Sequence, residues 1–347
     1  MPEGARAEEA VVLAAVRGGD AAAFAALTER YRRQLQVHCY RMVGSLEDAE
    51  DLVQETLLRA WRGRARFEGR SLFRTWLYHI ATNLCLNALE RLPRRVLPWQ
   101  VAPPALDPLA PLPAPSDLPW LQPYPDGLLE GIAQDGSEPG ELIAARETIE
   151  LAFLAAIQLL PPRQRAVLIL RDVLGWTAKE TASLLETSVA SANSALQRAR
   201  ATLKEQLPSR LEWSASAGPS EEEQALLDRF IDAYERGDFD ACAELLRDDA
   251  RLMMPPYPTW YQGRAAIVAF VEHNLAGGDP SRSRGPGRAV ATRANTQPAV
   301  AFYVQRQGDA HHRPLALSVL RIENGAIAEI ISFLTAPFSA FGLPPTL

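Results

Sequence analysis

Apolar residues recur every three or four positions over residues 45–63, which is the spacing of one buried helical face. Ser45 and Asp48 form a start signal for this helix, because a serine side chain can cap the first turn. The opposite face is acidic and polar, and it includes one apolar residue, as expected of a docking surface for a basic partner. An ordinary solvated face would be the simpler interpretation if the helix stood alone. This outer face consists of Glu47, Asp48, Asp51, Gln54, Glu55 and Leu58.

A second helix follows at once, with arginines concentrated before it and in its first turn. Phe73, Leu77, Ile80 and Leu84 form its apolar side, and a polar stripe lies beside them at steps of four. Arginines that can hold phosphates, with an aromatic ring able to stack on an unpaired base, are typical of single-strand capture. We expect Trp76 to belong to the core. The candidate nucleic-acid residues are Arg64, Arg66, Phe67, Arg70, Arg74, His79, Asn83 and Asn87.

Residues 160–207 predict a helix after Pro161-Pro162 and then two shorter helices. The first of these opens with the capping box Thr177-Ala-Lys-Glu180, and Ser188 is placed to cap the second. Small helical hairpins also occur in proteins that do not bind DNA, so this helix-turn-helix pattern is only moderately specific. The last helix has a buried face of Val189, Ala192, Leu196, Ala199 and Leu203. Its outward residues could contact base edges and phosphates in a major groove. They are Ser191, Asn193, Ser194, Gln197, Arg198 and Arg200.

The segment between these helical blocks, residues 93–140, is rich in proline and has little periodicity. It lacks Lys and Arg from Val96 to Ala145 and carries carboxylates throughout that stretch. Composition alone supports an unstructured spacer. The part from Trp120 to Leu129 is unusually apolar for a spacer, which favours docking on a surface.

The last part of the chain, residues 221–347, changes character after a break at 208–220. Helical patterns occupy residues 225–234, 239–246 and 265–275, and strand-like segments then follow at 299–305, 315–322 and 326–333. Asn324-Gly325 joins the last two strands and is a strong hairpin signal. Helices followed by a curved antiparallel sheet indicate a compact α+β domain.

Asp48-Ala-Glu-Asp-Leu-Val-Gln-Glu-Thr and Phe73-Arg-Thr-Trp-Leu-Tyr-His-Ile-Ala-Thr-Asn closely resemble region 2 of bacterial sigma-70 family sigma factors of the extracytoplasmic-function group. Ala195-Leu-Gln-Arg-Ala-Arg-Ala is similar to region 4 of the same family. The resemblance implies binding to core RNA polymerase, through its beta-prime coiled coil and beta flap, and recognition of the minus-ten and minus-thirty-five promoter elements. It also implies that the acidic linker threads the polymerase channel that later holds RNA.

The sequence departs from the family's pattern in region 4 at two places. Glu186-Thr187 stands where the family often has a turn glycine, and Asn193 and Ala195 stand where basic residues are common. Fewer charges predict a weaker and less salt-dependent contact with DNA.

Met253-Met-Pro-Pro-Tyr-Pro-Thr-Trp-Tyr-Gln-Gly-Arg-Ala-Ala-Ile and the order of elements around it resemble the SnoaL-like, polyketide-cyclase-like branch of the cone-shaped, nuclear-transport-factor-like (cystatin-like) fold. Relatives enclose a pocket between helices and sheet. The resemblance makes Met254, Trp260, Tyr261, Tyr303 and Phe333 candidates for that pocket, although each taken singly could equally fill the core.

Together these patterns predict a multidomain chain with two all-α domains and one α+β domain. The expected domains are region 2 at 8–92, the linker at 93–140, region 4 at 141–207, a second linker at 208–220 and a SnoaL-like regulatory domain at 221–347. No acid-base pair can be assigned from spacing, so we expect no catalytic residues, no cofactor and no metal site, and regulation by the last domain, with a small ligand as a possible effector.

Whole-chain numbers fit this organisation. A length of 347 residues suffices for several domains, and a net charge of −6 does not exclude DNA binding when positive charge is local. Three scattered cysteines, no signal peptide and no long apolar run predict a cytoplasmic bacterial protein without membrane contact.

Three functions are considered, of which the first is favoured, the second is the runner-up and the third is the weakest. The first is a dissociable polymerase subunit with its own regulator, acting instead of, or besides, a separate anti-sigma factor. The second is a bifunctional chain whose last domain is a genuine cyclase-like or isomerase-like enzyme or a small-ligand sensor. A plain helix-turn-helix repressor, the third, does not explain residues 45–91.

Overall fold

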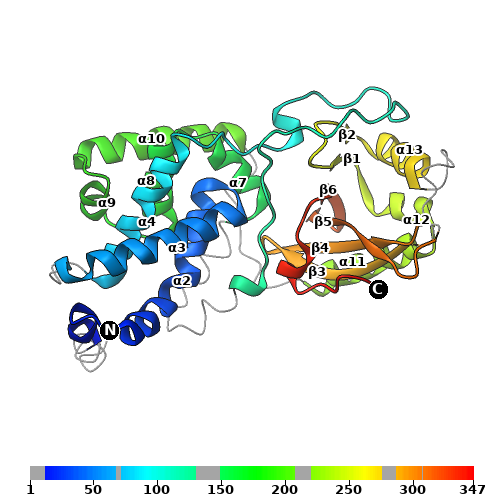
Figure 1. Cartoon of the computed structure of the whole chain (residues 1–347). Coiled ribbons are helices and arrows are strands. Elements are labelled where there is room, and N and C mark those ends of the chain that lie inside the picture. The colour runs from blue at the N-terminus through cyan, green and yellow to red at the C-terminus, as the bar shows by residue number, and fades with distance from the viewer. Residues whose placement is uncertain (1–11, 68–71, 130–148, 208–219, 276–286, 307) are drawn as a thin grey trace. The chain divides into compact units, whose positions relative to one another are not determined.

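The structure is a computed structural model that describes residues 12–67, 72–129, 149–207, 220–275, 287–306 and 308–347. Its chain divides into two compact units. The first combines residues 1–94 with 128–213, and the second combines residues 95–127 with 214–347. Figure 1 shows helices throughout the first unit and a sheet in the second. The described part of the Pro-rich segment therefore belongs largely to the unit of the C-terminal domain.

Three long helices form the first half of the helical unit. These are α2 (Ala21–Val43), α3 (Leu46–Gly63) and α4 (Phe73–Leu89), and each packs on the other two. Gly44 adopts a left-handed φ of 71° and ends α2, and the Ser45 side chain then accepts a hydrogen bond from the Asp48 N–H at 3.2 Å. The predicted cap of α3 is confirmed. A short 3-10 helix, η1 (Arg64–Arg66), follows α3.

Shorter helices make up the second half of this unit. They are α7 (Leu151–Gln158), α8 (Pro162–Leu168), the π-helical turn η3 (Ile169–Val173), α9 (Ala178–Leu184) and α10 (Val189–Gln206). Thr177 and Glu180 form the predicted capping box, and Ser188 caps α10 by accepting from the Ser191 N–H at 3.1 Å. The prediction of Val189 as buried is wrong: it is 43% exposed, because it lies in the first turn of α10 at the end of the hairpin.

The two halves of the helical unit are joined by hydrogen bonds to the end of α2. The Gln158 side chain donates to the Arg41 carbonyl at 3.2 Å, and Arg165 donates to the Met42 carbonyl. Helix α4 also contacts α8, and the rings of Tyr78 and Trp176 lie 5.7 Å apart. The last carbonyls of α2 have no partner within their own helix, and these side chains satisfy two of them.

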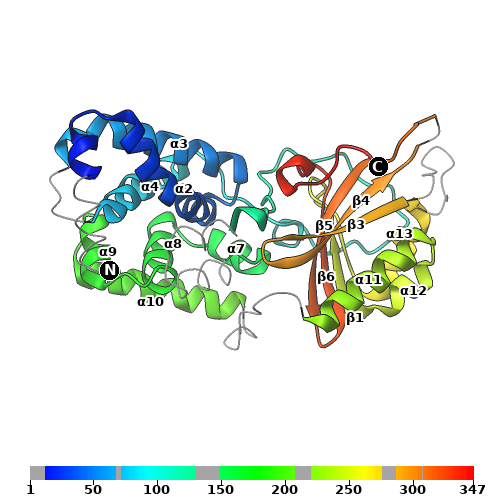
Figure 2. The same ribbon diagram turned by 90° about the horizontal axis from the view of Figure 1, so that it is seen from below.

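The second unit consists of helices on one face of a six-stranded sheet, as Figure 2 shows for α11, α12 and α13. The sheet order is β2-β1-β6-β5-β4-β3. The helices are α11 (Glu221–Glu235), α12 (Phe239–Glu244) and α13 (Arg264–Leu275). The strands are β1 (Leu246–Met253), β2 (Trp260–Gln262), β3 (Gly287–Ala294), β4 (Gln297–Val304), β5 (Arg313–Glu323) and β6 (Ala326–Phe333).

Strands β4, β5 and β6 confirm the predicted strands, and Asn324 and Gly325 turn the predicted hairpin with φ of 52° and 73°. The expectation of a wholly antiparallel sheet is wrong, since β1 pairs with β6 in parallel. Strands β1, β2 and β3 also escaped prediction. In β1 charged residues alternate with Ala250 and Leu252, so its apolar content is low.

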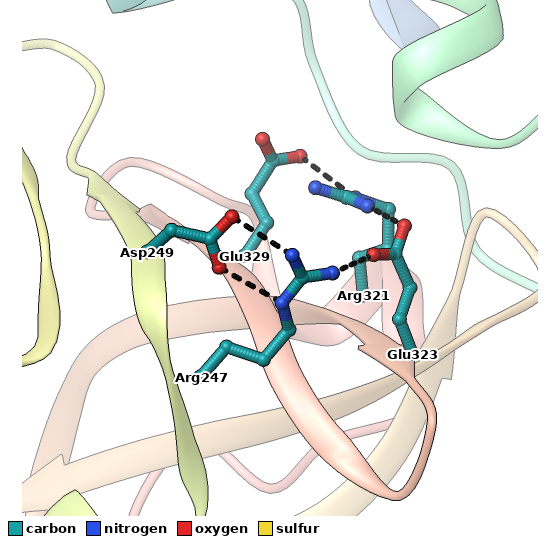
Figure 3. A network of polar contacts seen from close by, with 5 residues as sticks. All are labelled: Arg247, Asp249, Arg321, Glu323 and Glu329. Carbon is teal, nitrogen blue, oxygen red and sulfur yellow. Dashed lines mark hydrogen bonds and ion pairs between the residues drawn. The ribbon is translucent and has the colours of Figure 1, made fainter. Parts of the chain in front are cut away.

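A charged network joins the three strands β1, β5 and β6 (Figure 3). Arg247 of β1 pairs with Asp249 at 2.8 Å and also with Glu323 of β5. Arg321 pairs with Glu323, and its Nε lies 3.7 Å from the Glu329 carboxylate of β6. Burial raises the pKa of Glu329, and the nearby arginines Arg321 and Arg251 oppose that rise. The network supports the register in which β1, β5 and β6 are adjacent.

The Pro-rich segment follows the surface of the C-terminal domain. Trp120, Leu121 and Tyr124 are buried, which confirms that this stretch docks. The Tyr124 N–H donates to Asn295 Oδ1 at 2.7 Å, and Asp126 accepts from the Thr296 N–H at 2.8 Å and pairs with Arg293 at 3.2 Å. The linker is thus held to the turn between β3 and β4 by hydrogen bonds and an ion pair. For residues 95–127 the interpretation as an unstructured spacer is wrong, because these contacts satisfy backbone groups that a free spacer would leave to water.

Among the described residues, no helix is both long enough and apolar enough to cross a membrane. Cys39 and Cys85 are buried free thiols, and Cys242 is half-buried.

Candidate nucleic-acid and polymerase interfaces

The acidic face of α3 is open to solvent as the sequence predicts. Glu47, Asp51 and Gln54 are exposed, Asp48 and Glu55 are half-buried, and Leu58 is 50% exposed among them. Glu55 accepts a hydrogen bond from Arg59 one turn later at 2.7 Å. The exposed Leu58, one turn after Glu55, adds an apolar residue to this acidic face, which suits a basic partner.

The residues predicted to approach DNA near α4 differ in their surroundings. Arg66 is exposed, whereas Arg64 donates to the Trp61 carbonyl at 2.8 Å and lies 3.8 Å from the centre of the Trp61 ring. Arg74 lies over the Tyr78 ring at 5.4 Å. Arg70 falls outside the described residues. On α4, His79 and Asn83 are half-buried and joined at 3.5 Å, and Asn87 is exposed one turn further along.

Phe67 is not displayed for stacking in this structure. It is 6% exposed and packs against Phe73 at 5.6 Å and Trp76 at 5.0 Å between ring centres. Its guanidinium neighbour, Arg17, lies 5.7 Å from the ring. A DNA base could reach Phe67 only if this aromatic cluster opened, so the expectation of an available ring is corrected for this conformation, and its role on DNA stays a prediction.

All six residues predicted to face outward on α10 are exposed: Ser191, Asn193, Ser194, Gln197, Arg198 and Arg200. Two of these side chains nevertheless form hydrogen bonds within the protein. Arg198 donates to Ser194 at 2.7 Å, and Arg200 forms two bonds with Asp172 at 2.8 and 2.6 Å. These hydrogen bonds to Asp172 raise the pKa of Arg200. A DNA phosphate would have to compete with Asp172 for Arg200, which further lowers the effective charge of this helix.

The turn before α10 shows the physical effect of the missing glycine. Glu186 has a φ of 51°, in the left-handed region that non-glycine residues rarely adopt. On α9, hydrogen bonds from Thr177 lower the pKa of Glu180, which stabilises the helix start. Sequence alone showed both the capping box and the irregular turn.

The C-terminal domain contains a cavity of about 1000 Å³ between the inner sheet face and the helices. Met254 lines it, as the sequence predicts. Sequence reasoning missed most of the wall, including Phe230, Phe302, Ile330 and, from the linker, Leu112. Phe302 and Tyr303 are consecutive in β4 and point to opposite faces of the sheet, so the prediction assigned the wrong face of this strand to the pocket.

The other four predicted pocket residues do not line this cavity, which corrects that assignment. Tyr261 stacks on Phe270 at 4.3 Å within the core, and Tyr303 donates its hydroxyl to the Pro344 carbonyl at 2.8 Å. Trp260 donates its ring N–H to the Ala102 carbonyl of the linker at 2.8 Å. Phe333 is buried opposite Leu317 in the pairing of β5 and β6. Burial raises the pKa of Tyr261 to about 12 and also raises that of Tyr303.

Comparison with known proteins agrees with both halves of this architecture. Residues 27–95 match the family model "Sigma-70 region 2", residues 150–203 match "Sigma-70, region 4", and residues 227–330 match "SnoaL-like domain". ECF RNA polymerase sigma factor SigG of Mycobacterium tuberculosis is 47% identical over 332 residues, covering 95% of this chain and 86% of SigG. The chain belongs to the ECF RNA polymerase sigma factors.

Other members of the family show how much of this chain is shared with each of them. SigW of Bacillus subtilis, also an ECF sigma factor, is 29% identical over 198 residues and covers 55% of this chain and 92% of its own length. The crystal structure of the extracytoplasmic-function sigma factor SigJ of Mycobacterium tuberculosis matches with a TM-score of 0.56 at 20% identity, covering 92% of this chain and 99% of SigJ. The shared fold therefore includes both sigma regions and the SnoaL-like domain. Sigma factors are not enzymes, and this chain belongs to that class of protein.

In this sigma factor, region 2 (matched at 27–95) and region 4 (matched at 150–203) pack together within one unit. Helix α8 of region 4 contacts both α4 and α10, the two helices predicted to meet DNA. The structure thus holds the two candidate DNA-binding helices on either side of one short helix.

Proposed function

We propose that this ECF sigma factor binds core RNA polymerase through the acidic face of α3 and directs it to promoters by using α4 at the minus-ten element and α10 at the minus-thirty-five element. The C-terminal domain restrains this activity by retaining the linker. The assignment of the two DNA-binding helices follows from the family match and from the exposure of Asn87 on α4 and of Gln197 and Arg198 on α10.

One observation carries the regulatory part of the proposal: residues 95–127 form part of the compact C-terminal unit. Their backbone is tied to that domain at several points. The Ala105 N–H donates to the Trp260 carbonyl at 2.8 Å, the Ser116 N–H donates to the Pro256 carbonyl at 2.9 Å, and Tyr124 exchanges bonds with Asn295. A linker that must enter the polymerase channel would first have to release these contacts. Retention of the linker therefore opposes assembly with polymerase.

Transcription with purified core polymerase tests the whole proposal. Run-off transcription across a genomic promoter library would be compared for the full chain and a 1–213 truncation, in which the linker has lost its docking partner. We expect promoter-specific transcripts from both, and more from the truncation. Absence of transcripts from both would refute the sigma function, and lower output from the truncation would refute restraint by the C-terminal domain.

Charge reversal tests the polymerase-binding face. Asp51→Arg places a positive charge on the exposed face of α3, and like charges brought together at an interface cost several kcal/mol. We expect a large loss of affinity for core polymerase. Asp228→Arg is the matched control, because Asp228 is exposed on α11 in the C-terminal domain. Equal effects of the two substitutions would exclude α3 as the docking face.

Single alanine substitutions on α10 test promoter recognition. Gln197→Ala should cost about 1–3 kcal/mol in binding to a preferred minus-thirty-five sequence if the side chain contacts a base edge. Lys204→Ala, on an exposed residue near the end of the same helix, is the control for a phosphate contact. It should weaken binding to all sequences alike. Holoenzyme affinity for promoter variants would show which pattern holds.

Deletion of residues 120–129 tests the role of the linker in polymerase. This deletion removes the buried Trp120 and Tyr124 and so should release the linker from the C-terminal domain. If the segment also lies in the RNA channel, promoter opening and RNA escape should change even in the 1–213 form. Unchanged escape in that form would refute the channel role.

A further inference from the structure

The cavity of the C-terminal domain has the size and lining of a small-molecule site. Its volume of about 1000 Å³ lies at the upper end of the range for drug-sized ligands. Aromatic and aliphatic side chains line it, among them Phe230 of α11, Ile267 of α13 and Phe302 of β4. A well-packed domain leaves few voids larger than a water molecule, so a space of this size is not explained by the packing of the fold.

Part of the cavity wall comes from the linker. Leu112, Pro113 and Ala114 line the space, and Leu112 packs against the hydrophobic core of the C-terminal domain. The nearby bond from the Ser116 N–H to the Pro256 carbonyl holds this stretch in place. Leu109, three residues earlier, is instead 52% exposed and does not line the cavity. Release of the linker would remove one side of the site.

The charges around the cavity restrict what it can hold. Among the described residues that line it, Arg306 is the only one of a charged residue type, and its side chain is exposed. Burial raises the pKa of the Cys242 thiol to about 11, so this group stays neutral. The Ser318 and Ser332 hydroxyls lie 2.7 Å apart and bond to each other. A charged group deep in this space would lack a counter-ion and pay a large desolvation cost.

We propose that this cavity binds an uncharged, apolar small molecule that packs on Leu112, Pro113 and Ala114 and thereby stabilises the docked linker. The molecule acts as a repressing ligand, because it binds more tightly when the linker completes the wall, and a ligand shifts an equilibrium toward the state that it prefers. Linkage requires the reverse effect as well, so polymerase must weaken ligand binding by the same factor. This inference rests on the proposed restraint of the sigma regions by linker retention.

Binding of Nile red, a neutral apolar dye whose fluorescence rises in apolar surroundings, tests the site in the full chain. We expect saturable binding that Val268→Trp weakens by about tenfold or more, because Val268 lines the cavity and is only half-buried on α13. Ala265→Trp, at an exposed position on the same helix outside the cavity lining, should leave the affinity unchanged. Absence of binding, or equal affinity in both variants, would overturn the proposal.

Substitution in the linker tests the coupling. Leu112→Asp should weaken dye binding and raise transcription without ligand, whereas Leu109→Asp should do neither. Core polymerase should lower the dye affinity of the full chain, and saturating dye should lower transcription. If dye binds in the cavity but Leu112→Asp changes neither affinity nor transcription, the coupling is overturned.

The two proposals fail separately. Loss of transcription from every form, including the 1–213 truncation, would overturn the proposed function. Normal transcription from the full chain that is insensitive to bound dye would overturn only the repressing ligand.

Discussion

Arg165 connects region 4 to region 2 and is the residue whose replacement best tests the packed arrangement of the sigma regions. This residue is 2% exposed and lies in the middle of α8. One terminal nitrogen donates to the Met42 carbonyl of region 2 and to Gln158 Oε1 at 2.6 Å. The other donates to the carbonyls of Gln158 at 2.9 Å and Leu160 at 3.2 Å. Only the bond to Met42 crosses between the regions.

The expected change in the free energy of unfolding on Arg165→Met substitution follows from these contacts. Four hydrogen bonds from a charged donor at about 1.5 kcal/mol each contribute roughly 6 kcal/mol. Burial, together with the nearby charge of Arg94, lowers the pKa of Arg165 to about 10, so the charged guanidinium carries an unfavourable contribution of roughly 3 kcal/mol that the substitution removes. We therefore expect a net loss of about 3 kcal/mol in the free energy of unfolding, because methionine keeps the apolar volume.

Although Arg165→Met should lower the stability of the fold, it should strengthen binding to core polymerase. The minus-ten and minus-thirty-five elements lie about 25 base pairs apart, or roughly 85 Å at 3.4 Å per base pair. Helices α4 and α10 both contact α8, whose seven residues span only about 10 Å. The two regions must therefore separate to occupy both elements. Loss of the single bond to Met42 favours separation by about 1.5 kcal/mol, or roughly tenfold.

Two measurements on the full chain check this reasoning. Chemical denaturation gives the loss of stability, and fluorescence anisotropy of the labelled protein gives its affinity for core polymerase. Arg171→Met is the matched control, because Arg171 donates to the Trp176 carbonyl at 2.7 Å within region 4. We expect tighter polymerase binding for Arg165→Met alone. Weaker binding, or the same change in both variants, would refute the view that region 2 and region 4 packing limits assembly.

Three further predictions concern stability, each measured by denaturation of the full chain. Glu186→Gly should raise the melting temperature, because relief of the left-handed φ of 51° stabilises the folded state by about 1–2 kcal/mol, whereas the added chain entropy of glycine offsets only about 0.5–1 kcal/mol. Glu186→Ala should not raise the melting temperature, because alanine does not relieve the left-handed φ. An equal rise in both variants would contradict the argument. Burial, together with the charge of Arg41, lowers the pKa of His38 to about 3. Below pH 6.5 the His38 imidazole is therefore protonated in the unfolded chain but stays neutral in the folded chain. Stability should fall by about 2 kcal/mol between pH 6.5 and 5 and less in His38→Gln; equal slopes would be inconsistent with this assignment. Gly287→Ala should cost about 1–3 kcal/mol, because its Cβ would lie 2.6 Å from Cε1 of Tyr234, and Tyr234→Leu should restore part of the loss; a neutral Gly287→Ala would contradict the clash.

Prediction from sequence succeeded where a feature depends on residues close together in the chain. The caps at Ser45, Thr177 and Ser188 form as predicted, because each requires a side chain and a backbone N–H three residues later. The Asn324-Gly325 hairpin depends on two residues that tolerate positive φ. Helical periodicity likewise placed the acidic face of α3 and the outward residues of α10, since a helix turns by a fixed angle per residue.

Prediction was weaker where both faces of a strand are apolar. In β4, seven of the eight residues from Gln297 to Val304 are buried, so alternation does not distinguish the face toward the cavity from the face toward the outer core. For this reason Tyr303 was assigned to the pocket and Phe302 was missed. The parallel pairing of β1 with β6 could not be predicted either, because it joins segments about 80 residues apart through a helix and four other strands.

The sequence by itself determined the family, the helices that carry the candidate interfaces and the presence of an α+β domain, because these follow from local patterns and motifs. Only the tertiary structure decided that the linker closes one side of a cavity, that Arg165 joins region 4 to region 2, and that Phe67 is buried. Each of these contacts joins residues through packing in space, and the free energy that selects them depends on which surfaces meet once the elements have formed.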